Sequence, residues 1–95
     1  MSNNNYLEVL QKNMDAVRNG EAKEEMMPLL QWLLNYRPAT FGDDNVEYKS
    51  TAEIQSTLAD MVTIDLNLIS TVMWRLGYEV SVSTVYPTWA MIPTN

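Results

Sequence analysis

Residues 50–92 read STAEIQSTLADMVTIDLNLISTVMWRLGYEVSVSTVYPTWAMI, and this stretch decides the fold. It opens with Ser50 followed three residues later by Glu53. This is the capping-box spacing, in which each side chain accepts a hydrogen bond from the other residue's free backbone N–H. Apolar residues then recur at helical spacing, at Ile54, Leu58 and Met61. The sequence therefore predicts a helix that begins at Ser50.

A second helix is expected after the polar break at Thr63, with Asp65 as its cap. It would run to about Leu76 and end at Gly77, a residue type that favours the left-handed position after a helix. One broad face is apolar and carries Leu66, Leu68, Ile69, Val72, Met73 and Leu76. The opposite face carries Asn67, Ser70, Thr71, Trp74 and Arg75, with Trp74 near its centre.

Two short strands should follow, at residues 78–82 and 88–92, with residues 83–87 as the tip between them. In the first strand the apolar residues alternate, which predicts that Tyr78, Val80 and Val82 share one face. A capped helix, a tight turn, a second helix and two strands around a tip make up the plan of a winged helix. We therefore expect an α+β fold with a winged helix over residues 46–93.

The amino-terminal part, residues 5–36, is predicted to add two helices that pack on the winged helix. The first covers residues 6–18, with Tyr6, Val9, Leu10, Met14 and Val17 on one side. The second covers residues 21–36, where Pro28 lies in the first turn or marks a kink. Residues 37–45 are interpreted as a surface loop and residues 46–49 as a strand. The expected order is α-α-β-α-α-β-β, in a single domain over residues 1–95.

Charge and composition narrow the functional classes. The chain has 95 residues, and its 12 acidic and 6 basic residues give a net charge of −6, which repels phosphate backbones and anionic membranes. It has no cysteine and no histidine, so it lacks a thiolate nucleophile and the usual zinc ligands. No secretory signal and no apolar run of membrane-spanning length is encoded. We expect a soluble, cytoplasmic protein with no cofactor, no metal and no membrane partner.

The acidic residues do not suggest catalysis. Glu21, Glu24 and Glu25 suit the positive end of a helix dipole, and Asp43 and Asp44 suit a solvated turn. A catalytic pair of carboxylates needs burial or crowding to shift its pKa, and this spacing does not provide either. We expect a protein that is not an enzyme.

Four segments resemble winged-helix modules: STAEI at 50–54, residues 69–73, RLGY at 75–78 and WAMIP at 89–93. The likeness is greatest to modules at the carboxyl ends of phage- and plasmid-type replication proteins, such as the primase–helicase group of mobile elements. It covers about half of the chain, from Tyr48 onward. The resemblance implies contact with nucleic acid or docking of a neighbouring domain. This chain departs from nucleic-acid-binding members because residues 83–87 contain no lysine or arginine.

The exposed face of the second helix is the candidate interaction site, comprising Asn67, Ser70, Thr71, Trp74 and Arg75. Trp74 would anchor a protein partner or a second copy of the chain, because buried aromatics dominate many interfaces. The competing interpretation is that Trp74 packs inside the monomer, on the amino-terminal helices or the wing. Thr84 and Tyr86 are candidate wing contacts.

Two other functions stay open. The first is nucleic-acid binding, in which Arg75 and Asn67 would contact phosphates and base edges. It is disfavoured because Arg75 is the one basic residue among residues 51–95, against Glu53, Asp60, Asp65 and Glu79. The second is an acidic inhibitor that imitates a nucleic-acid backbone. Our main expectation is a non-enzymatic interaction module.

Overall fold

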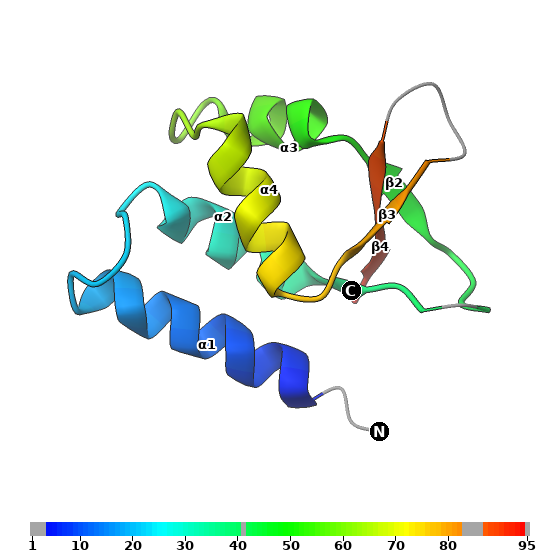
Figure 1. The fold of residues 1–95 in the computed structure, drawn as a ribbon, viewed down its shortest axis with the longest axis horizontal. Helices are drawn as coiled ribbons and strands as arrows, with labels where there is room; N and C mark the ends of the chain where they lie inside the picture. Colours follow the sequence, from blue (N-terminus) through cyan, green and yellow to red (C-terminus); the bar gives the residue numbers. More distant parts are fainter. Residues whose placement is uncertain (1–3, 41, 83–86, 95) are drawn as a thin grey trace.

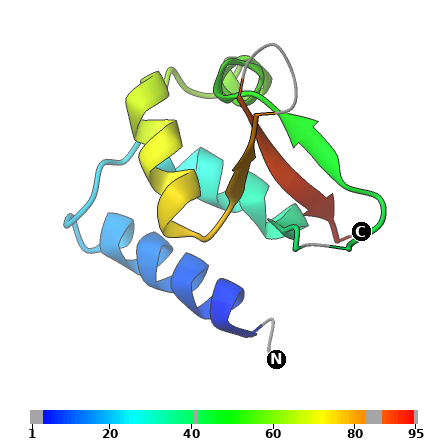
Figure 2. The same ribbon diagram turned by 45° about the vertical axis from the view of Figure 1, so that its right-hand side comes forward.

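A computed structural model describes residues 4–40, 42–82 and 87–94, which form four α-helices and a small antiparallel sheet. Helix α1 packs on α2, α2 on α4 and α4 on α3, and the sheet stands at one end of this stack (Figure 1, Figure 2). The expected α+β class is confirmed. The elements are α1 (Asn4–Arg18), α2 (Met26–Trp32), the 3₁₀ turn η1 (Leu33–Asn35), β1 (Tyr36–Pro38), β2 (Glu47–Lys49), α3 (Thr51–Leu58), α4 (Leu66–Arg75), β3 (Glu79–Ser81) and β4 (Thr88–Pro93).

Helix α1 forms where its apolar stripe predicts it. Leu10, Met14 and Val17 are buried, whereas Val9 stays 37% exposed, so the predicted stripe is wider than the buried one. The helix ends at Arg18 and is followed by Gly20, whose φ of 78° is left-handed. The N–H of Glu21 then donates to the carbonyl of Ala16, which satisfies a helix-end acceptor.

The second predicted helix, residues 21–36, is wrong at both ends. Helix α2 begins only at Met26 and passes into η1 at Leu33, while Tyr36 is already extended, with φ −137°. Pro28 explains the late start: its ring would clash with the carbonyl four residues earlier, so a helix cannot run through it from residue 21. Within α2, Pro28 lies in the first turn, where its missing N–H leaves no bond unmade.

The last strand, β4, is the centre of the sheet. Met91 pairs with Pro38 of β1 and also with Glu47 of β2, so β1 and β2 lie on opposite sides of β4. Strand β3 pairs with residues 88–90 of β4, and β2 pairs with residues 89–91. Trp89 and Ala90 therefore have β2 on one side and β3 on the other, so β3 shares the edge of β1. The sheet is therefore three strands wide, with β1 and β3 following each other along one edge.

Two predictions about the strands need correction. Residues 37–45 were expected to be a loop, yet Arg37 and Pro38 belong to β1. Proline is tolerated there because β1 lies at a sheet edge, where a missing N–H breaks no bond to a further strand. In β3, Tyr78 is buried just before the strand, but Val80 and Val82 are 41% and 77% exposed. Alternation predicted that Val80 and Val82 share a face with Tyr78, but the hydrophobic core does not extend along the edge of the sheet as far as these two residues.

The helix boundaries in residues 50–77 follow local signals. Both bonds of the capping box form, with the N–H of Glu53 donating to Ser50 Oγ at 3.1 Å and the N–H of Ser50 donating to Glu53 Oε1 at 2.7 Å. Asp65 caps α4 by accepting from the N–H of Asn67 at 3.0 Å. Gly77 ends α4 with φ 91°. These predicted caps are all present.

The connection between α3 and α4 is longer than the tight turn expected from sequence. Helix α3 stops at Leu58, and residues 59–65 lead to α4. Met61, predicted to continue the apolar face of α3, lies in this connection and is 65% exposed. Ile64 replaces it in the core and is fully buried.

The core is one cluster to which α1, α2, α3, α4 and β4 all contribute. Leu29, Leu30, Ile54, Ile69, Met73 and Met91 are among its fully buried members. Because the amino-terminal helices share these contacts with α3, α4 and the sheet, neither half of the chain encloses the cluster alone.

A hydrogen-bonded pair of tyrosines ties α1 to the chain entering β3. Tyr6 Oη donates to the carbonyl of Leu33 at 2.8 Å, and the two hydroxyl oxygens of Tyr6 and Tyr78 are 2.6 Å apart. A phenol has one proton, and Tyr6 gives it to Leu33, so Tyr78 is the donor to Tyr6. The rings meet edge to face, at 5.7 Å and 87°.

Replacing Tyr6 with Phe should destabilise the protein more than replacing Tyr78 with Phe. Tyr6→Phe leaves the buried hydroxyl of Tyr78 without an acceptor, at a cost of about 2 kcal/mol, whereas Tyr78→Phe leaves the bond to Leu33 intact and costs about 1 kcal/mol. Urea unfolding of the two variants and the double variant measures this. Equal losses, or additive losses in the double variant, would contradict the assigned donor direction.

The same pair should make the fold sensitive to alkali. Burial raises the pKa of Tyr6 to about 12, and burial together with the neighbouring Tyr6 hydroxyl raises the pKa of Tyr78 further. Unfolded tyrosine ionises near pH 10, so the stabilisation is complete below about pH 10 and is lost as pH rises through the folded pKa values. Urea midpoints from pH 8 to 12 should therefore fall steeply above pH 10. The drop should shrink in the Tyr6→Phe, Tyr78→Phe double variant and persist in Tyr48→Phe, at an exposed ring.

Candidate functional site

Trp74 projects from the outer side of α4 and is 71% exposed. The inner side of the helix is used for the core, where Ile69, Val72 and Met73 are buried. Helix α4 lies in front of α2 in Figure 1, and no element is drawn in front of it. The alternative prediction, that Trp74 packs inside the monomer, is therefore wrong.

Three of the predicted face residues form a stripe with the tryptophan at its end. Asn67, Thr71 and Trp74 follow a spacing of four and then three residues, which places them above one another on a helix. All three are exposed, and Thr71 Oγ1 donates to the carbonyl of Asn67 at 2.9 Å. An indole at one end and a carboxamide at the other give this stripe both an apolar contact and hydrogen-bonding groups.

Ser70 contributes less to this face than the sequence suggested. It is only partly exposed, and its Oγ lies 3.3 Å from Thr51 Oγ1 of α3. Thr51 Oγ1 in turn accepts a hydrogen bond from Trp89 Nε1 at 3.0 Å. Ser70 therefore faces the junction of α3, α4 and β4, and its role is to join these elements.

Arg75 is exposed in the last turn of α4, where a cation interacts favourably with the helix dipole. No described residue forms an ion pair with it. The candidate wing contacts, Thr84 and Tyr86, lie outside the described residues.

Sequence reasoning missed two other exposed apolar regions. On the sheet, Tyr48 is 54% exposed, in addition to Val80 and Val82. Near the start of α1, Leu7 and Leu34 are 52% and 48% exposed. Leu7 lies off the apolar side of its helical wheel, and this was the available signal. Leu34 gave no such signal, because it belongs to a predicted helix, residues 21–36, whose later half is apolar around most of the wheel.

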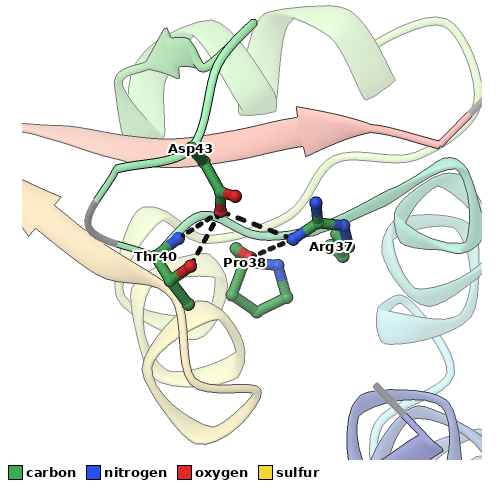
Figure 3. Close-up of polar contacts among 4 residues, drawn as sticks. All are labelled: Arg37, Pro38, Thr40 and Asp43. Atoms are coloured by element: carbon green, nitrogen blue, oxygen red, sulfur yellow. Dashed lines mark hydrogen bonds and ion pairs between the residues drawn. The ribbon is translucent and has the colours of Figure 1, made fainter. Parts of the chain in front are cut away.

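The turn after β1 is organised by one carboxylate (Figure 3). Asp43 Oδ2 accepts from the N–H and the hydroxyl of Thr40, at 2.7 and 2.9 Å, and lies 3.5 Å from Arg37 Nη1. The hydrogen bonds from Thr40, with a smaller contribution from Arg37, lower the pKa of Asp43. Asp43 is thus a turn former, as predicted, and it also holds Arg37 in place.

The described residues contain no group of three or more acidic side chains placed to hold a metal ion. Across the same part of the chain, no helix combines the length and the apolar character needed to cross a membrane.

The chain matches no protein-family model, and comparisons with curated proteins and with solved structures also give no match. Any functional conclusion therefore rests on the residues and geometry of this chain.

Acrylamide quenching should identify Trp74 as the exposed indole. Trp89 is 6% exposed and Trp32 is partly covered by Tyr36, whose ring centroid is 4.8 Å away. Trp74→Phe should therefore lower the quenching constant and shift the remaining emission to shorter wavelength, whereas Trp89→Phe should leave the quenchable component. Unchanged quenching in Trp74→Phe would show that the indole is covered in solution.

Proposed function

We propose that this chain is a non-enzymatic interaction module of winged-helix type, which binds a protein partner or a second copy of itself through the outer face of α4. The observation that carries the proposal is the 71% exposure of Trp74 on that face. The face comprises Asn67, Ser70, Thr71, Trp74 and Arg75.

Chain order and strand order support the winged-helix assignment. Strand β2, helices α3 and α4, and strands β3 and β4 follow one another along the chain. Strand β4 lies between β2 and β3, so the last two strands pair as a ribbon beside the helical pair. Helices α1 and α2 and strand β1 are additions to this plan.

Energetics favour an interface role for the indole. When a partner covers a large aromatic side chain that was exposed to water, the complex is stabilised by on the order of 2 kcal/mol. Trp74 contributes nothing to the monomer core, so this free energy is available for association. Asn67 and Thr71 beside it provide polar groups of the kind found around such anchors.

Charge favours a protein partner over nucleic acid. Affinity for nucleic acid follows the number of phosphates that cations neutralise, and the α4 face has one cation, Arg75. The net charge of −6 opposes a polyanion further. A neutral or basic protein surface meets neither obstacle.

Trp74→Ala should abolish association while leaving the fold intact. Because the indole is exposed, we expect the free energy of unfolding to change by no more than about 0.5 kcal/mol. Light scattering over a concentration series tests self-association, and capture from the native host tests a partner. The matched control is Met61→Ala, which removes a side chain that is 65% exposed outside the α4 face.

Loss of the thermal transition in Trp74→Ala would show a structural role for the indole. Association that survives the substitution would place the interface elsewhere. Salt-dependent binding of duplex DNA at micromolar or lower concentration would favour the nucleic-acid alternative.

A further inference from the structure

A groove of about 400 Å³ brings together two arginines that are far apart in sequence. Arg37, in β1, and Arg75, at the end of α4, both line it, and Tyr6 and Val9 of α1 contribute another wall. Its described lining contains no acidic residue. In a chain with 12 acidic and 6 basic residues, this lining holds two cations, of which Arg37 also contacts Asp43.

Both guanidinium groups keep donors for a ligand. Arg75 has no ion pair with any residue that the structure describes. Arg37 contacts Asp43 at 3.5 Å and the carbonyl of Pro38 at 3.4 Å, and both contacts use the same nitrogen, Nη1 (Figure 3). A guanidinium carries five N–H donors, so most of those on Arg37 are not used by these contacts.

The two guanidinium groups that line the groove offer positive charge to an anion. Guanidinium groups bind carboxylates through paired, charge-assisted hydrogen bonds, which are stronger than neutral ones. Thr40 holds Asp43, and Asp43 contacts Arg37 Nη1 at 3.5 Å, so the Arg37 side chain is restrained before a ligand arrives. Less conformational entropy is then lost on binding.

An apolar hollow of about 300 Å³ adjoins the groove and shares Tyr6 and Arg37 with it. Leu7, Leu34 and Tyr36 line this hollow, and both leucines are about half exposed. A ligand that extends from the groove into the hollow would therefore carry an apolar group next to its anion.

We propose that these two adjoining depressions bind an acidic peptide segment, with a carboxylate between Arg37 and Arg75 and a neighbouring apolar side chain against Leu7 and Leu34. The apolar hollow favours a peptide over a nucleic-acid backbone, because a peptide can place an apolar side chain next to its carboxylate. This site is separate from the Trp74 face and shares only Arg75 with it.

The probe is a fluorescein-labelled peptide of ten residues in which Leu and Glu alternate, titrated by anisotropy into the full chain at about 0.1 M salt, where the Debye length is about 10 Å. A second peptide has Gln in place of each Glu. We expect the acidic peptide to bind and the Gln peptide to bind at least about tenfold more weakly, since charge-assisted hydrogen bonds are stronger than neutral ones. Arg75→Gln and Leu34→Ser should each weaken binding of the acidic peptide about fivefold or more.

Arg18→Gln is the matched control, because it changes the net charge by the same amount at an exposed arginine outside the groove. It should leave the affinity within about twofold, as a distant surface charge is screened by salt. No binding of the acidic peptide, equal binding of the Gln peptide, or equal loss in Arg18→Gln and Arg75→Gln would overturn the proposal. Full competition by millimolar inorganic phosphate combined with normal binding by Leu34→Ser would also overturn it, because that result indicates a simple anion hole.

Trp74→Ala separates this site from the proposed α4 interface. It should bind the acidic peptide like the wild type, even where it abolishes association through α4. Loss of peptide binding in Trp74→Ala with the fold intact would contradict a separate site.

Discussion

Strand β4 is the constraint on which the rest of the structure depends. Strands β1, β2 and β3 all pair with β4, and no two of them pair with each other in the described sheet. Trp89 and Met91 of the same strand enter the core, and Trp89 also bonds to Thr51 of α3. The last strand of the chain thus pairs with three strands that come earlier in the sequence. The fold therefore depends on contacts between residues that are far apart in sequence.

The tyrosine pair complements this arrangement on the helical side. Tyr78 precedes β3 directly, and its bond to Tyr6 joins α1 to the point where the chain leaves α4. Together with the shared core, this bond keeps the additional amino-terminal helices on the inner side of α4. The outer side, with Trp74, is left to solvent.

The sequence predicted those features whose causes are local. The caps at Ser50 and Asp65 and the left-handed Gly77 depend on residues within a few positions of one another, and all three form. Strand β1 was missed because its pairing with β4 joins residues more than fifty positions apart, and Pro38 resembles a loop signal. The exposure of Val80 was missed for a related reason, since alternation defines a face but not what covers it.

The candidate sites also combine features that have a local cause with features that depend on long-range packing. Helical spacing predicted that Asn67, Thr71 and Trp74 share a face, but only the placement of α1 and α2 decides that the face is open. The groove of Arg37 and Arg75 had no sequence signal, because it exists only when β1 pairs with β4 and brings Arg37 to the end of α4.

The central claim, that the indole of Trp74 forms the interaction face, is tested most directly by the indole N–H signals in nuclear magnetic resonance spectra. The signal of Trp74 should shift or broaden as protein concentration rises or as a partner is added, whereas that of Trp89, hydrogen-bonded to Thr51, should stay in place. Association that perturbs Trp89 or Trp32 and leaves the Trp74 signal unchanged would contradict the account.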